Sequence, residues 1–221
     1  MGKLIVIDGL DGSGKQTQAA LLARHLEAAG HPVRPVSFPT YTESSAPIRL
    51  YLEGALGSLE QVNVYAASAF YAVDRYASYR RDWGAHYEQG GLVLADRYTT
   101  ANLIHQMGKL DRAQWEDYIA WLEETEYGRF GLPRPDLVLF LDLPVELSAQ
   151  LLERRYGGDP QKRDLHERDA AYLRRCRETA GFAAGRLGWK MVTCADGANI
   201  REVRDIAEEL LGYALCMLRG S

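Results

Sequence analysis

Five short apolar runs recur along the chain, and longer segments of mixed polar and apolar residues separate them. The runs are residues 3–8, 33–38, 92–96, 136–143 and 190–195. Near-continuous apolar runs of this length are typical of parallel strands buried on both faces of a sheet. Between them, residues 16–30 have the spacing of a helix that ends at Gly30, and residues 61–87 also have helical spacing. This alternation predicts an α/β fold in which helices flank a central parallel sheet of five strands.

Length and charge narrow the class of protein. A chain of 221 residues, 47% of them hydrophobic, is expected to form a single domain over residues 1–221. The formal net charge of -4 gives no broad basic surface, so we expect small partners and no nucleic acid. The first apolar run leads directly into a glycine-rich loop, which indicates a strand and not a signal peptide.

Apolar run length and cysteine spacing indicate where in the cell the protein is located. No apolar run approaches the ~20 residues that a membrane span requires, so we expect no membrane association. The three cysteines are far apart in the sequence, a spacing that fits neither a disulfide framework nor a zinc site. Together these features predict a cytoplasmic protein.

The glycine-rich loop carries the clearest chemistry. Gly9, Gly14 and Lys15 have the G-x-x-x-x-G-K spacing between a strand and a helix, which is the context of a phosphate-binding loop. Backbone N–H groups and the helix N-terminus surround phosphate there, and the lysine reaches the β and γ oxygens of ATP. The plainer alternative is a tight glycine turn. The expected ATP contacts are Gly9, Leu10, Asp11, Gly12, Ser13, Gly14, Lys15, Gln16 and Thr17.

Gln16 departs from the usual loop, because a hydroxyl that holds Mg²⁺ normally follows the lysine. Thr17 is not a simple substitute, since one helical residue rotates a side chain by about 100°. Mg²⁺ takes one or two carboxylates together with phosphate oxygens, so other ligands can serve. By position the carboxylates are those of Asp8, Asp11 and Asp96, and the amide oxygen of Gln16 is a further candidate.

Several motifs in this order resemble the thymidylate kinase family, and the resemblance covers nearly the whole chain. They are GLDGSGK at 9–15, FPTY at 38–41, YAVDR at 71–75, DRYTTAN at 96–102 and DLHE at 164–167. The resemblance implies a three-layer P-loop kinase fold with a mobile lid, and Mg²⁺-dependent phosphorylation of dTMP to dTDP by ATP in dTTP biosynthesis. Some members carry a long polar residue after the loop lysine, as Gln16 is here.

The resemblance also assigns the acceptor phosphate. Arg97 is expected to bind the phosphate of dTMP, a task suited to the planar guanidinium, while Asp96 works near the metal and the reacting phosphates. Lys15, Asp96 and Arg97 are therefore expected catalytic residues. Tyr41 is expected to reach the same phosphate. The alternative for Asp96 and Arg97 is an ion pair that caps the strand.

The base of dTMP is expected between two helices. Tyr71 and Arg75 share one helix face, where the family stacks an aromatic ring on thymine and donates from arginine to a base carbonyl. Without the resemblance, the aromatic stripe of this segment would be interpreted as core or as a dimer surface; it consists of Phe70, Tyr71, Tyr76 and Tyr79. The other expected dTMP contacts are Asp11, Phe38, Pro39, Asn102 and Gln106.

Two residues depart from the family pattern around this pocket. Thr40 stands where many relatives have arginine, so a phosphate-facing cation is either absent or supplied by Arg49. His105 stands where relatives often have a tyrosine near the sugar. Both changes leave open a kinase for another nucleotide, such as dUMP.

The charged segment 154–168 is predicted to be the lid. The loop itself lacks an arginine, so the family pattern places the catalytic cation here, with Arg155 and Arg163 as the expected residues. Arg154 is a candidate for packing on adenine, and Glu167 is a candidate for the metal or the lid arginines. The plain alternative is a solvated charged surface.

Two properties stay open beyond the reaction. The chain can also be interpreted as a non-catalytic nucleotide-binding regulator, although Lys15, Asp96 and Arg97 argue against it. Members of the family are commonly homodimers, and the apolar stripe over residues 64–76 is the expected dimer surface.

Overall fold

The five expected strands form one parallel sheet in the computed structural model. It describes residues 1–58, 61–156 and 170–220, with the backbone alone at residues 154–156 and 170. The strands are β1 (Lys3–Gly9), β2 (Val33–Ser37), β3 (Leu92–Asp96), β4 (Leu137–Asp142) and β5 (Lys190–Thr193). They are arranged in the order β2-β3-β1-β4-β5, with β1 at the centre between β3 and β4. This confirms the predicted parallel sheet.

Alternate residues of the central strand face two different cores. Leu4 and Val6 of β1 belong to one apolar cluster, and Ile5 and Ile7 belong to another. All four side chains are fully buried. Successive side chains of a strand point to opposite faces, so helices must cover the sheet on both sides.

The outer strands correct one prediction. We expected all five apolar runs to be buried on both faces, but β2 and β5 carry mostly exposed or half-buried residues. Both are edge strands, as their places in the order show. Pro35 lies within β2, where a missing N–H is tolerated because one side of the strand has no partner strand.

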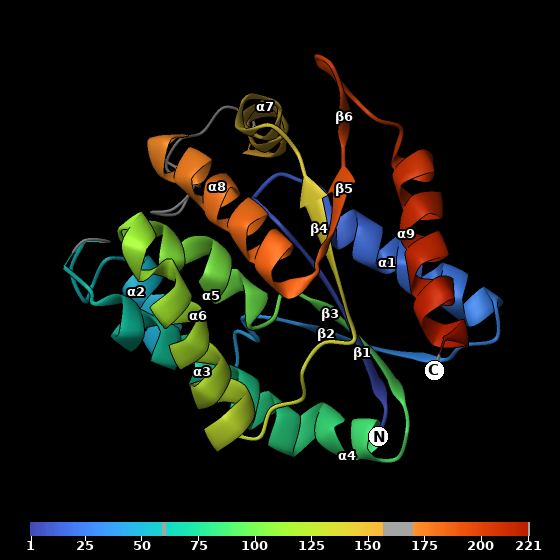
Figure 1. Ribbon diagram of the computed structural model, residues 1–221, viewed down its shortest axis with the longest axis horizontal. Helices are drawn as coiled ribbons and strands as arrows, with labels where there is room; N and C mark the ends of the chain where they lie inside the picture. The colour runs from blue at the N-terminus through green and yellow to red at the C-terminus, as the bar shows by residue number, and fades with distance from the viewer. Residues whose placement is uncertain (59–60, 157–169, 221) are drawn as a thin grey trace.

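Helices form the outer two layers (Figure 1). α1 (Lys15–Ala28) and α9 (Val203–Arg219) pack together over one face, and α5 (Thr100–His105) and α8 (Ala170–Leu187) pack together over the other. The remaining helices are α2 (Ala46–Leu52), α3 (Val64–Ser78), α4 (Gly84–Glu88), α6 (Trp115–Leu122) and α7 (Val145–Tyr156).

The predicted helices agree with the observed ones. The segment 16–30 covers α1 except for its first residue, Lys15, and Gly30 follows the helix with a positive φ of 86°. The segment 61–87 contains α3, a π-helical turn at Tyr79–Trp83, and all of α4 except its last residue, Glu88. A short hairpin of β6 (Ala195–Asp196) and β7 (Asn199–Ile200) precedes α9.

Strand order decides where functional residues meet. β1 ends at Gly9, β2 at Ser37 and β3 at Asp96, and these three strands are neighbours in the sheet. Ligands of open α/β sheets bind beyond the carboxyl ends of such strands. The loops that carry the expected motifs therefore lie together, beyond the carboxyl ends of these strands.

Candidate active site

A cavity of about 920 Å³ lies at this carboxyl edge of the sheet. Its walls include the glycine loop, the residues that follow β2 and β3, and parts of α3 and α5. The expected site residues that line it are Asp11, Gly12, Gly14, Lys15, Gln16, Thr17, Phe38, Pro39, Tyr41, Tyr71, Arg75, Asp96, Arg97, Asn102 and Gln106. Three other expected ATP contacts, Gly9, Leu10 and Ser13, are buried outside this lining.

The glycine loop places a buried ammonium beside the cavity. Gly12 and Gly14 have positive φ values of 80° and 85°, which suit glycine best. A Cβ at Gly12 would lie 2.7 Å from the carbonyl oxygen of Ser148, so the site also excludes larger residues. Lys15 begins α1, and its Nζ donates to the Leu10 carbonyl at 2.8 Å. Burial lowers the pKa of Lys15, so a nearby anion would stabilise its charged form.

Residues that could hold a metal flank this loop. Gln16 and Thr17 both have exposed side chains that line the cavity, so the rotation along α1 does not remove Thr17 from its wall. Asp11 and Asp96 add carboxylates to the lining. Within residues 1–58, 61–156 and 170–220, no three His, Cys, Asp or Glu side chains form a metal cluster. Two carboxylates fit Mg²⁺ that arrives with phosphate ligands.

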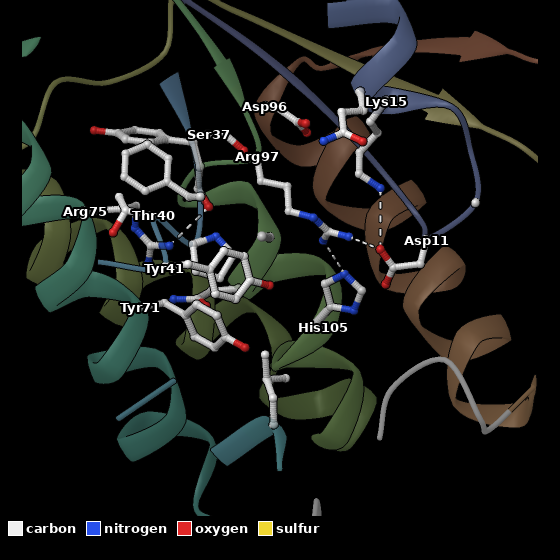
Figure 2. Close-up of a pocket in the computed structure, with 18 of the residues that line it drawn as sticks. Asp11, Lys15, Ser37, Thr40, Tyr41, Tyr71, Arg75, Asp96, Arg97 and His105 are labelled. Atoms are coloured by element: carbon white, nitrogen blue, oxygen red, sulfur yellow. Dashed lines mark hydrogen bonds and ion pairs between the residues drawn. The ribbon is translucent and has the colours of Figure 1, made fainter. Parts of the chain in front are cut away.

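Arg97 lies in the cavity wall beside Asp11 and His105 (Figure 2). Its Nη2 donates to Asp11 Oδ1, and its Nη1 lies 2.8 Å from Nε2 of His105. Asp11 Oδ1 is also 3.7 Å from Lys15 Nζ, so two cations flank one carboxylate. Burial alone would lower the pKa of Arg97, but Asp11, Asp8 and other carboxylates raise it overall. The guanidinium therefore remains charged.

The backbone of Arg97 is unusual. Its φ is 65°, in the left-handed region that a side chain with a Cβ seldom adopts. Its N–H donates to the Ile7 carbonyl at 2.9 Å, which ties this residue to β1. Such conformations persist only where the surrounding structure fixes them, and they are concentrated at functional sites.

Asp8 lies behind the loop and is fully buried. Its Oδ1 accepts from the Gly9 N–H at 2.8 Å, and its Oδ2 accepts from Thr100 Oγ1 at 2.6 Å. Burial raises the pKa of Asp8, although Arg97 Nη1 at 3.9 Å opposes the shift. Asp8 does not line the cavity. The structure thus favours Asp11 and Asp96 over Asp8 as metal ligands.

The loop after β2 is fixed by a residue that the sequence analysis did not single out. Asp74 is buried, and its carboxylate accepts from Thr40 N at 2.8 Å, Thr40 Oγ1 at 2.5 Å and Ser44 Oγ at 2.6 Å. Tyr41 in this loop is 62% exposed, with a positive φ of 53°. Asp74 therefore sets the path of the chain that carries Tyr41 into the cavity lining.

Arg49 does not take its expected place. It was a candidate for the phosphate-facing cation that Thr40 lacks. Instead its Nη1 donates to the carbonyl oxygens of Tyr41 and Thr42 at 3.3 and 3.1 Å, and it does not line the cavity. His105, expected near the sugar, does line the cavity and contacts Arg97.

The far end of the cavity is aromatic and amide-rich. Figure 2 shows Tyr41 and Tyr71 on the side away from Lys15. Asn102 is 2% exposed, and its Nδ2 lies 3.4 Å from both the Ser68 carbonyl and Glu126 Oε1.

Arg75 has a partner that the sequence analysis did not identify. Its Nε and Nη2 donate to Glu126 Oε2 and Oε1 at 2.6 and 2.5 Å, and its Nη1 donates to the Tyr98 carbonyl at 3.3 Å. A buried cation among aromatic side chains needs a counter-charge. Glu126, 51 positions along the chain, provides it.

The predicted lid lies mostly outside the described residues. Arg154 and Arg155 belong to the backbone of α7. Arg163 and Glu167 lie outside the described residues. The lid, its boundaries and its catalytic cation remain predictions.

Known proteins match this chain over most of its length. The family model for thymidylate kinase matches residues 7–205. The thymidylate kinase of Mycobacterium tuberculosis (strain H37Rv) is 33% identical over 205 residues, which cover 89% of this chain and 92% of that protein. The chain belongs to the thymidylate kinase family. The probable thymidylate kinase of Pyrococcus abyssi is 34% identical over 155 residues, which cover 70% of this chain and 71% of that protein.

A solved thymidylate kinase shares the fold. The structure from Candida albicans gives a TM-score of 0.70, at 22% sequence identity, and the match covers 96% of this chain and 90% of that one. The expected family, three-layer fold and phosphotransferase activity, ATP-dependent phosphorylation of dTMP to dTDP, are thereby confirmed. The relatives named here favour neither another acceptor nor a non-catalytic regulator. Across the part of the chain that the structure describes, no helix is long and apolar enough to cross a membrane.

Proposed function

We propose that the cavity holds ATP and dTMP end to end, with the reacting phosphates between Lys15 and Arg97. The observation that carries this proposal is the convergence of these two cations on one carboxylate, Asp11, in a cavity with an aromatic end. Phosphoryl transfer requires positioning and positive charge more than covalent chemistry by the protein. The cavity can position the two nucleotides, and the two cations supply the positive charge.

The ATP phosphates occupy the glycine loop. The positive φ values of Gly12 and Gly14 shape a backbone that can surround phosphate oxygens, and the N-terminus of α1 adds positive potential. Lys15 Nζ is 3.7 Å from Asp11 and turns to the β and γ oxygens when they are present. Desolvation of this ammonium strengthens its interaction with the phosphate charge.

The acceptor phosphate lies against Arg97. A guanidinium matches the geometry of phosphate with two parallel hydrogen bonds, and carboxylates around Arg97 ensure that it stays charged. Tyr41 approaches from the loop that Asp74 fixes. Asp96 lines the cavity directly before Arg97 and orients the reacting groups.

The thymine ring lies at the other end of the cavity. Tyr71 offers its ring for stacking, with Phe38, Pro39 and Gln106 along the walls. Arg75 supplies only donors, and Asn102 can supply an acceptor. Thymine presents a carbonyl beside an N–H group, and this donor and acceptor pair fits that edge.

Asp11, Asp96 and the amide oxygen of Gln16 would hold Mg²⁺, since all three residues line the cavity. When bound, the ion neutralises negative charge on the phosphate oxygens. Arg155 and Arg163 are proposed as the cations that complete charge neutralisation, with Arg154 near the adenine and Glu167 supporting the lid. Closure of residues 154–168 would exclude water and suppress ATP hydrolysis.

A homodimer is proposed through α3. Tyr65, Val73 and Tyr76 on this helix are 38%, 49% and 43% exposed, which is unusual for large apolar side chains on one helix. A cytoplasmic location is proposed as well, since Cys176, Cys194 and Cys216 are all free thiols.

Replacement of Tyr71 tests the position of the base. Loss of one stacking ring is worth about 1–3 kcal/mol, so Tyr71→Ala should raise the KM for dTMP by about 5- to 150-fold and leave the KM for ATP unchanged. Tyr213→Ala, on α9 behind the sheet, is the matched control and should change neither constant. An unchanged KM for dTMP in Tyr71→Ala would contradict the proposed base pocket.

A further inference from the structure

A buried carboxylate lies directly behind the proposed base pocket. Glu126 is 2% exposed and belongs to a π-helical turn, Glu123–Arg129, that follows α6. It does not line the cavity, but it contacts two residues that do, Arg75 and Asn102. π-Helical turns are rare and are often found at functional sites. Any effect of Glu126 on a bound base therefore passes through these two neighbours.

The contact with Arg75 fixes a guanidinium in one orientation. Two parallel hydrogen bonds of 2.6 and 2.5 Å join the two side chains, and Arg75 is only 1% exposed. This fork geometry leaves the guanidinium little freedom to rotate. Buried ion pairs contribute little net stability compared with apolar residues of similar size, so stability alone is a weak reason for this pair.

The contact with Asn102 fixes an amide. Its Nδ2 lies 3.4 Å from Glu126 Oε1 and 3.4 Å from the Ser68 carbonyl, and both partners are acceptors. Rotation of the amide by 180° would place its own carbonyl oxygen against a carboxylate and a carbonyl. That arrangement is electrostatically unfavourable in a buried site. Oδ1 is therefore held on the side of the amide that faces away from Glu126.

These two orientations define a hydrogen-bonding pattern. Arg75 can only donate, and Asn102 with Nδ2 occupied offers an acceptor. Thymine carries a carbonyl at C4 and an N–H at N3, which match this pair. Cytosine carries an amino group at C4 and an unprotonated N3, so the pattern opposes it at both positions.

We propose that Glu126 is a positioning residue that makes the pocket select thymine over cytosine. This inference rests on the proposed function, in which the base lies against Arg75 and Asn102. A glutamine at this position would present one donor and one acceptor in place of two charged acceptors. The Asn102 amide could then rotate by 180°, and the Arg75 guanidinium would lose the carboxylate that balances its charge.

The ratio of kcat/KM for dTMP to kcat/KM for dCMP tests the inference. This ratio does not depend on the fraction of correctly folded enzyme, so loss of folded protein alone leaves it unchanged. We expect Glu126→Gln to lower the ratio at least about tenfold, because reversal of one hydrogen-bonding group changes discrimination strongly. Glu126→Asp keeps the charge but shortens the side chain, and should lower the ratio at least about threefold.

Glu124→Gln is the matched control. Glu124 lies in the same π-helical turn, but it is paired with Arg129 at the surface, where the two side chains are 63% and 73% exposed. This variant should keep the wild-type ratio within about twofold.

The outcomes separate the two claims. If the wild-type enzyme shows no preference for dTMP over dCMP, the proposed base pocket is wrong and the role of Glu126 fails with it. If the wild type prefers dTMP and folded Glu126→Gln keeps the ratio within about twofold, only the inference is overturned. If Glu126→Gln does not fold, the same comparison with Glu126→Asp decides.

Discussion

Arg97 Nη1 lies 2.8 Å from His105 Nε2, while Nη2 of the same guanidinium contacts Asp11. The arginine is thus held from both sides, on a backbone whose φ of 65° suits few residues other than glycine. This arrangement aims a permanent cation at the space beside Lys15. It is the structural basis for assigning the acceptor phosphate to Arg97.

Arg97→Ala should lower kcat/KM for dTMP by about 10²- to 10³-fold, because it removes the charge that binds the acceptor phosphate beside the transferred group. The variant should remain folded, since its side chain is at the cavity wall and not in an apolar core. Arg34→Ala is the control, because Arg34 forms an exposed ion pair with Asp82. Steady-state ADP release and a thermal unfolding scan check both statements. Near-normal turnover of dTMP in Arg97→Ala would refute the assignment.

Gln16→Thr should retain magnesium-dependent activity within about threefold, since Mg²⁺ needs only one or two protein ligands besides phosphate and water. Gln16 has an exposed side chain, so threonine fits the position without repacking. A magnesium titration of ADP release measures the effect. Loss of activity with unchanged nucleotide binding would instead make the Gln16 amide a required ligand.

Lys109 should make stability depend on pH. Burial lowers the pKa of this ammonium to about 8, beside the Tyr51 ring centroid at 4.9 Å. In the unfolded chain the pKa is about 10.4. Between these values the unfolded chain binds a proton that the folded chain has lost, so the free energy of unfolding rises with pH.

The size of this pH effect can be measured by comparing the wild type with a variant that lacks the Lys109 ammonium. The full shift corresponds to about 3 kcal/mol, and partial exposure of the side chain reduces the expected change to about 1 kcal/mol. Urea unfolding of the wild type and of Lys109→Met at pH 7 and pH 10 isolates it. The stability of the wild type relative to the variant should increase at pH 10. A difference that is independent of pH would contradict the lowered pKa.

The central part of the fold could be predicted because β1, β3 and β4 are buried on both faces and show this as continuous apolar runs. The burial of β2 and β5 was overestimated. A strand at the edge of a sheet can have the same apolar run as a central strand, although many of its residues remain accessible to solvent. Strand order is set by contacts between distant segments. Local sequence does not contain it.

Some residues of the site could likewise be predicted from the sequence, and others could not. The glycine loop and Arg97 could be predicted because their positions follow directly from the ends of strands. Asp74 and Glu126 could not, since each acts on partners 24 or more positions away. The need of Arg75 for a counter-charge was the only sign of Glu126. Nothing in the local pattern distinguished Glu126 from the acidic residues next to it.

The most direct test of the central claim is ADP release from MgATP with dTMP, dUMP, UMP, dCMP and dGMP offered separately as acceptors. The account predicts selective turnover of dTMP that requires Mg²⁺. Preferred turnover of a different acceptor would keep the kinase and contradict the assignment of the pocket around Tyr71, Arg75 and Asn102. Binding of ATP without turnover of any acceptor would contradict the catalytic site itself.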